Sequence, residues 1–126
     1  MDSRGRLRPG VVAAGDVASV TTPGGVRRVP LWNSAIEQAK VAAAALLQGD
    51  AAPELTLQPY FWTEQFGLSV KGIGHLPLPG VPAYVDGDPE AGSSLLRWED
   101  TGYGAAAVAV NYRIAVPRLR RMCAAA

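Results

Sequence analysis

The chain has 126 residues, 48% of them hydrophobic and 18% charged, and its formal net charge is +1. This length allows one domain or a part of one, and the small charge argues against nucleic acid or an anionic membrane as a partner. One cysteine and one histidine exclude an intramolecular disulfide, a dithiol redox pair and a histidine-rich metal site. No stretch approaches the roughly 18 apolar residues of a membrane helix, and no secretory leader is recognisable. The sequence therefore predicts a cytoplasmic protein.

The chain begins with a predicted strand and a predicted loop. Residues 11–14 (VVAA) form a short apolar run that is typical of a buried strand. Residues 19–30 are predicted to be a loop, because Pro23, Gly24 and Gly25 strongly favour a turn.

A long helix is expected over residues 34–48. Ser34 and Glu37 have the spacing of a capping box, Asn33 is an alternative cap, and Gly49 is a plausible stop. Apolar side chains recur at helical spacing and share one face. They are Ile36, Ala39, Ala43, Leu46 and Leu47.

The second half predicts a small antiparallel sheet. Alternating patterns favour strands at 68–75, 83–88, 93–99 and 105–111. The turn sequences DPEAG (88–92) and DTGYG (100–104) separate the later strands. The tail at 112–123 has a helical pattern, in which Pro117 must lie near the first turn. The expected fold class is α+β, a small antiparallel sheet with flanking helices, preceded by a strand and a helix from the end of a βα unit.

Three short motifs follow one another along the chain. They are AAGD at 13–16, W-N-x-A-x-x-Q-A at 32–39 and Y-F-W-T-E-Q-F-G at 60–67. In this order they resemble the C-terminal third of the FAD-dependent NAD(P)H:ferredoxin reductases of the putidaredoxin reductase and biphenyl dioxygenase reductase type, in the pyridine nucleotide-disulfide oxidoreductase superfamily. The resemblance implies that residues 1–52 are the remnant of an FAD-binding domain and that residues 53–126 are the reductase C-terminal α+β domain.

The resemblance gives a role to the end of the first strand. Gly15 would let FAD approach the backbone, and Asp16 would accept a hydrogen bond from a ribityl hydroxyl. The alternative is that Asp16 caps its own turn.

The other two motifs are implied to face the flavin ring. Trp32, Asn33 and Ala35 lie where the helix begins, and its free N–H groups would approach the pyrimidine edge of the isoalloxazine. Trp62 would lie beside the ring and exclude water. The alternatives are that Trp32 is a hydrophobic staple residue and that Trp62 is a core aromatic. No residue is assigned as a catalytic acid or base, and no metal ligand is predicted.

A dinucleotide-binding turn, G-x-G-x-x-G, is absent from the sequence. The chain therefore has no recognisable basis for holding the pyrophosphate and adenine of FAD, or NAD(P)H. We expect weak or no FAD binding by this chain alone. Residues 2–50 would also lack the sheet on which they pack, so their apolar face must find the C-terminal domain, a second copy or a separate chain.

Three hypotheses about function remain open. In the first, the chain is the C-terminal portion of a reductase that passes electrons from NAD(P)H through FAD to a [2Fe–2S] ferredoxin, and it is inactive without the missing FAD- and NAD-binding domains. In the second, it is a free-standing non-catalytic module that completes a split reductase or docks a ferredoxin. In the third, it is a small domain with an unrelated ligand. Basic residues could receive an acidic ferredoxin, or could simply be solvated. They are Arg27, Arg28, Lys40, Arg118, Arg120 and Arg121.

Overall fold

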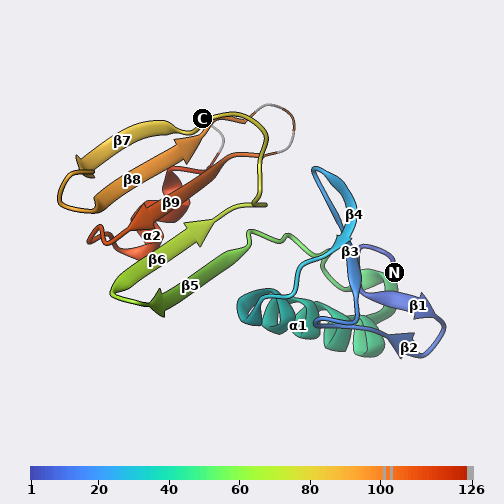
Figure 1. Cartoon of the computed structure of the whole chain (residues 1–126). Helices are drawn as coiled ribbons and strands as arrows, with labels where there is room; N and C mark the ends of the chain where they lie inside the picture. Colours follow the sequence, from blue (N-terminus) through green and yellow to red (C-terminus); the bar gives the residue numbers. More distant parts are fainter. Residues whose placement is uncertain (101, 103, 125–126) are drawn as a thin grey trace. The chain divides into compact units, whose positions relative to one another are not determined.

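The computed structural model describes residues 1–100, 102 and 104–124, and it divides into two compact units, Met1–Pro59 and Tyr60–Ala126 (Figure 1). The expected boundary between residues 52 and 53 falls inside the first unit. The turn predicted at 100–104 contains Thr101 and Tyr103, which lie outside the described residues. None of the helices in the described ranges combines the length and apolar character needed to cross a membrane.

The first unit begins with a short hairpin of two antiparallel strands, β1 (Arg6–Arg8) and β2 (Val11–Val12). The strand predicted at 11–14 is therefore shorter than expected, and its residues are half-buried rather than buried.

A second hairpin replaces the predicted loop at 19–30. Strands β3 (Ser19–Thr22) and β4 (Gly25–Arg28) pair in antiparallel register, and the Thr22 hydroxyl donates to the Gly25 carbonyl over 2.7 Å. Val20 and Thr22 are buried while Thr21 is exposed, which is the alternation of a strand. The loop prediction was wrong because Pro23 and its glycine neighbour form the turn of a hairpin.

Helix α1 (Trp32–Gln48) follows, and it begins two residues earlier than predicted. Leu31 is the N-cap, in extended conformation and without a side-chain hydrogen bond, and its carbonyl accepts the Ala35 N–H over 2.9 Å. The helix has already begun at Ser34 and Asn33, so neither residue caps it and the predicted capping box is wrong. Gly49 ends the helix as expected, with a φ of +60° and its N–H bonded to the Ala45 carbonyl. A 3₁₀ turn, η1 (Gly49–Ala51), comes next.

The buried face of α1 carries small and polar side chains instead of the predicted apolar set. This face consists of Ser34, Gln38, Ala42 and Ala45. The backbone of the first hairpin approaches it closely, since a Cβ at Gly5 would lie 3.2 Å from the Ala42 Cβ. Large side chains do not fit at such a distance, so the apolar set lies on another face, where Trp32 is 69% exposed and Leu47 is 86% exposed.

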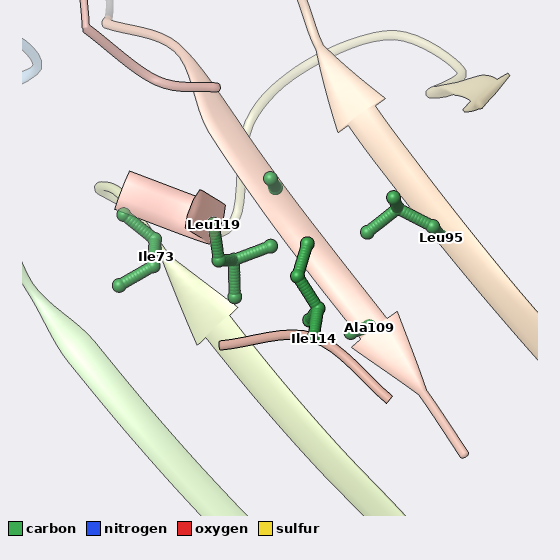
Figure 2. Close-up of a cluster of buried hydrophobic side chains, with 6 residues drawn as sticks. Ile73, Leu95, Ala109, Ile114 and Leu119 are labelled. Carbon is green, nitrogen blue, oxygen red and sulfur yellow. The ribbon is translucent and has the colours of Figure 1, made fainter. Parts of the chain in front are cut away.

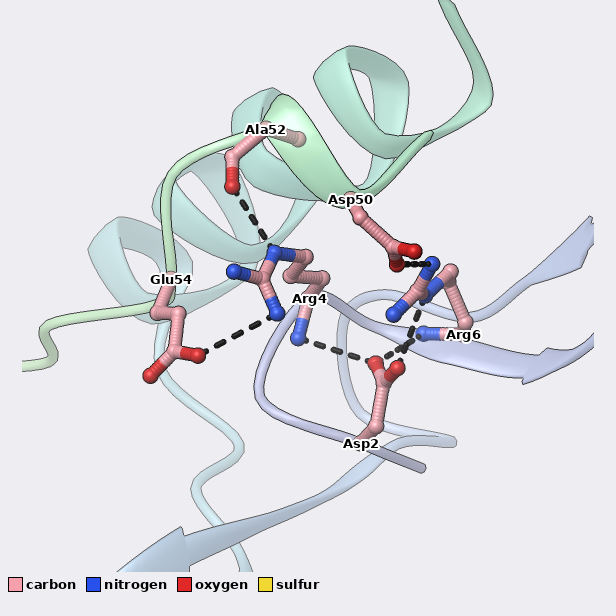
Figure 3. Close-up of polar contacts among 6 residues, drawn as sticks. All are labelled: Asp2, Arg4, Arg6, Asp50, Ala52 and Glu54. Carbon is pink, nitrogen blue, oxygen red and sulfur yellow. Dashed lines mark hydrogen bonds and ion pairs between the residues drawn. The ribbon is translucent and has the colours of Figure 1, made fainter. Parts of the chain in front are cut away.

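An ion-pair network joins the N-terminal turn to the segment after α1 (Figure 3). Asp2 accepts hydrogen bonds from the Arg6 backbone N–H at 2.9 Å and from the Arg6 Nε at 2.7 Å. Arg6 also donates to Asp50 over 2.6 Å, and the Arg4 Nε donates to the Ala52 carbonyl over 2.8 Å. These bonds fix the start of the first unit against the end of its helix.

The second unit is a five-stranded antiparallel sheet in the order β5-β6-β9-β8-β7 (Figure 1). The strands are β5 (Tyr60–Gln65), β6 (Leu68–Ile73), β7 (Ala83–Asp88), β8 (Ser93–Trp98) and β9 (Ala106–Val110). Four of them match predicted strands. The motif at 60–67 forms β5 and its turn, a strand that the sequence analysis does not predict. The α+β fold class is confirmed.

Helix α2 (Val116–Arg121) covers one face of this sheet and encloses the core (Figure 2). The buried core residues are Ile73, Leu95, Ala107, Ala109, Ile114 and Leu119. The helix is shorter than the predicted 112–123. Pro117 lies in its first turn, as expected, and a longer helix would press the proline ring against the carbonyl of Arg113.

Candidate functional site

The AAGD motif forms a tight turn after β2, which we call the 15–18 turn. Gly15 has a φ of +82°, and its carbonyl accepts the Ala18 N–H over 3.0 Å. Asp16 is exposed in this turn, and its carboxylate has no hydrogen bond or ion pair to any described residue. The geometry therefore gives no support to a capping role for Asp16 in its own turn, and it leaves the carboxylate open to a ligand.

The beginning of α1 lies against the 15–18 turn. The Gly15 N–H donates to the Gln38 Oε1 over 3.0 Å. A Cβ built at Gly15 would lie 3.8 Å from the Ala35 Cβ, which is ordinary van der Waals contact. The structure thus brings together Gly15, Asp16 and Ala35 from the predicted site. Gln38 was not among the predicted site residues, although it stands in the W-N-x-A-x-x-Q-A motif and on the helix face that also carries Ser34.

The N-terminus of α1 has the electrostatic character of an anion or acceptor site. Its N-cap residue Leu31 makes no side-chain cap hydrogen bond, and no acidic residue lies in the first turn of this described helix. The uncapped N–H groups and the helix dipole leave partial positive charge there. Trp32 and Asn33 belong to this turn, with Trp32 mostly exposed and Asn33 half-buried.

Trp62 lies on β5, in the second unit. Its ring stacks on Tyr60, with ring centroids 5.6 Å apart and an interplanar angle of 23°. Trp62 pairs with Lys71 on β6, which in turn pairs with Ala109 on β9. Paired residues share one face of a sheet, and Ala109 belongs to the core under α2, so Trp62 lies on the face that α2 covers. Its side chain is 48% exposed, so Trp62 is a surface aromatic and not a core residue. The tyrosine on which it stacks is partly buried against the core. Trp62 lies in the second unit, whereas Asp16 lies in the first.

The titratable groups with shifted pKa in the second unit lie outside the predicted site. The Tyr112 hydroxyl donates to the Asp86 Oδ2 over 2.6 Å, which lowers the pKa of Asp86 and raises the pKa of Tyr112. Burial raises the pKa of the Cys123 thiol, so the thiol is protonated at neutral pH. Among the described residues, no cluster of three or more His, Cys, Asp or Glu side chains could hold a metal ion.

A hollow of about 680 Å³ lies between the first hairpin and the C-terminal end of α1. Arg6, Leu7, Pro9 and Ala45 are among its lining residues, and none of the predicted site residues is. Arg6 already pairs with two carboxylates, so the hollow presents no free anion site at that side chain.

Comparison with known proteins places the whole chain in one group of relatives, although no family model matches it. It is 30% identical over 127 residues to the 3-phenylpropionate/cinnamic acid dioxygenase ferredoxin–NAD(+) reductase component of Photorhabdus laumondii, covering 98% of this chain and 31% of that protein. The crystal structure of Fdr9 aligns with 96% of this chain and 31% of its own, with a TM-score of 0.71 and 30% identity. The chain belongs to the ferredoxin reductase family. These relatives support a C-terminal ferredoxin-reductase-type domain in this chain.

Other relatives match shorter parts of the chain. The probable ferredoxin reductase CtmF of Castellaniella defragrans is 37% identical over 95 residues, which is 68% of this chain and 21% of that protein. Apoptosis-inducing factor 3 of Homo sapiens is 40% identical over 72 residues, which is 53% of this chain. This ferredoxin-reductase-type chain spans less than a third of the length of these relatives.

Proposed function

We propose that this chain supplies the C-terminal part of an FAD-dependent NAD(P)H:ferredoxin reductase, which passes electrons from NAD(P)H through FAD to a [2Fe–2S] ferredoxin. One observation carries the proposal. The exposed Asp16 carboxylate lies in a turn that is bonded to α1 at Gln38, in a chain that matches a ferredoxin–NAD(+) reductase component over 98% of its length.

The residues present suit one part of FAD. Asp16 would accept a ribityl hydroxyl, Gly15 and Ala35 leave the backbone accessible beside it, and the uncapped N-terminus of α1 would face the pyrimidine edge of the ring. Trp62 would shield the ring from water. When bound, FAD supplies the hydride and single-electron chemistry. The sequence has no phosphate-binding glycine turn, so the remainder of FAD and NAD(P)H would be held by other domains.

The exposed apolar face of α1 suits contact with another protein surface, either in the same polypeptide or on a separate chain. Its apolar side chains include Trp32, Ile36, Leu46 and Leu47, and all four are at least 39% exposed. We propose that residues 1–52 complete an FAD-binding domain through this face and that residues 53–126 form the reductase C-terminal domain. The same face favours a second candidate function, that of a module which completes a split reductase on a separate chain; a second copy of the chain could also cover it.

The first test is a titration of the full chain with FAD, followed by visible absorbance and tryptophan fluorescence. We expect no saturable binding, because the residues that would hold the pyrophosphate are not in this sequence. A yellow protein with saturable quenching would overturn the need for separate nucleotide-binding domains.

The second test places the chain in the context of its relatives. A chimera would carry this chain in place of the corresponding part of the Photorhabdus laumondii reductase component. Asp16→Ala should lower its affinity for FAD about tenfold or more, because a charge-assisted hydrogen bond is lost. Glu90→Ala, which removes an exposed carboxylate of the second unit, is the control. A folded chimera that binds FAD equally well with and without Asp16 would contradict the proposed site.

A further inference from the structure

Gln38 stands out on the buried face of α1. Its side chain is 1% exposed and is the largest polar one that is fully buried among the described residues. Burying an amide in this position is unfavourable unless its groups are bonded. The Oε1 accepts the Gly15 N–H over 3.0 Å, whereas the Nε2 has no partner among the described residues.

Such a half-satisfied amide lowers stability relative to an apolar side chain of the same size. Apolar residues would suit the position, since its helical neighbours on this face include Ala42 and Ala45. Stability alone therefore does not account for the glutamine. Its one hydrogen bond does, because that bond reaches across 23 residues of sequence to a single backbone group.

That backbone group is the first N–H of the 15–18 turn. Gly15 has a φ of +82°, a conformation in which the chain leaves strand geometry, and Asp16 follows directly. This N–H lies beyond the end of β2 at Val12, and the partner it has among the described residues is the Gln38 Oε1. Without Gln38, the N–H would have only solvent to bond, and the start of the turn would lose its tie to α1.

We propose that Gln38 is the positioning residue of this site. Its amide oxygen holds the 15–18 turn against α1, so that the Asp16 carboxylate keeps a fixed position relative to the N-terminus of the helix. Ala35 lies beside the turn as well, since a Cβ added at Gly15 would come within 3.8 Å of the Ala35 Cβ. The role for flavin binding rests on the proposed function, whereas the anchoring of the turn does not.

Gln38 has a neighbour that fits this role. Ser34 lies one helical turn earlier on the same face, is also 1% exposed, and its Oγ has no partner among the described residues. Ser34 and Gln38 are thus the two polar residues of a face that otherwise carries Ala42 and Ala45. Of these two, only Gln38 has a side-chain hydrogen bond to the 15–18 turn among the described residues.

The test uses the isotope-labelled full chain in solution. In the unaltered protein, a scalar coupling across the hydrogen bond should join the Gly15 amide nitrogen and the Gln38 side-chain carbonyl carbon. Gln38→Met keeps the length of the side chain but removes the acceptor. It should speed amide hydrogen exchange at Gly15 roughly tenfold, while exchange at Ala35, whose N–H bonds the Leu31 carbonyl, stays unchanged.

Gln48→Met is the matched control, because Gln48 is exposed at the end of the same helix and should leave exchange at Gly15 unchanged. Absence of the coupling in the unaltered chain, or unchanged exchange at Gly15 in Gln38→Met, would overturn the proposal. If Gln38→Met does not fold, the coupling in the unaltered chain decides alone.

A parallel experiment separates this inference from the proposed function. Gln38→Met and Gln48→Met would be compared in the FAD-binding chimera, where only the former should weaken FAD binding, by roughly tenfold. A coupling and an exchange effect without any loss of FAD affinity in Gln38→Met would keep the anchoring and overturn its role at the flavin. A chimera that does not bind FAD, with the coupling intact, would count against the proposed function alone.

Discussion

Two glycines near the end of β6 differ in what an added side chain would meet. A Cβ at Gly74 would lie 2.5 Å from the Ala105 carbonyl oxygen and 2.8 Å from the Ala106 Cα, and the residue has a φ of +104°. The three atoms nearest to a Cβ at Gly72 all belong to the ring of Phe61, a half-buried side chain on the neighbouring strand β5.

We therefore predict that Gly74→Ala destabilises the second unit far more than Gly72→Ala does. The expected losses are roughly 2–4 kcal/mol for Gly74, where backbone must move, and about 1 kcal/mol for Gly72, where a ring can turn. Urea unfolding followed by tryptophan fluorescence measures both. Equal losses would show that the ring of Phe61 is as immobile as the backbone beside Gly74.

At the scale of elements, the ion-pair network joins the N-terminal turn to the segment that follows α1 (Figure 3). Hydrogen bonds from Arg6 lower the pKa of Asp2 from 3.8 to about 2, and Arg6 also lowers the pKa of Asp50. A carboxylate with a lowered pKa stabilises the folded state above its unfolded pKa, and that contribution is lost as the pH falls through the folded pKa.

The first unit should therefore lose stability between about pH 4 and pH 2. Asp2→Asn should be less stable than the unaltered chain at pH 7 and should lose less on acidification. Urea unfolding at pH 7 and pH 2.5, followed by tryptophan fluorescence, measures the difference. A parallel loss of stability in both proteins would contradict a stabilising role for the Asp2 carboxylate.

At the scale of the whole molecule, the exposed apolar face of α1 should govern association. Exposed apolar patches favour contact with another protein surface. We predict that the isolated chain self-associates and that the double substitution Ile36→Gln and Leu47→Gln weakens this association about tenfold or more. The helix should persist, since Ile36 is 39% exposed and Leu47 is 86% exposed.

Sedimentation velocity over a range of concentrations measures the effect. Val81→Gln is the control, because Val81 is 93% exposed but lies in the second unit, in the segment between β6 and β7. A chain that stays monomeric at all concentrations would contradict the prediction of self-association.

The sequence by itself determined the elements whose signals are local. Alternating patterns predicted four of the five strands of the sheet, and the glycine at 49 marked the end of α1, because strand periodicity and helix stops depend on neighbouring residues. The ordered motifs indicated the ferredoxin reductase family, which the relatives confirm. The start of α1 and the β3–β4 hairpin were missed, since backbone hydrogen bonds that form on folding outweighed the capping and loop signals.

Only the tertiary structure decided which face of α1 is buried and which groups meet at the site. The periodicity of α1 groups Ile36, Leu46 and Leu47 correctly, but periodicity does not say what covers them. The close approach of the hairpin backbone selects the face with small side chains instead. The bond between Gly15 and Gln38 likewise joins two positions that are distant in sequence. No local pattern encodes such a contact, because it exists only after the strand and the helix have packed together.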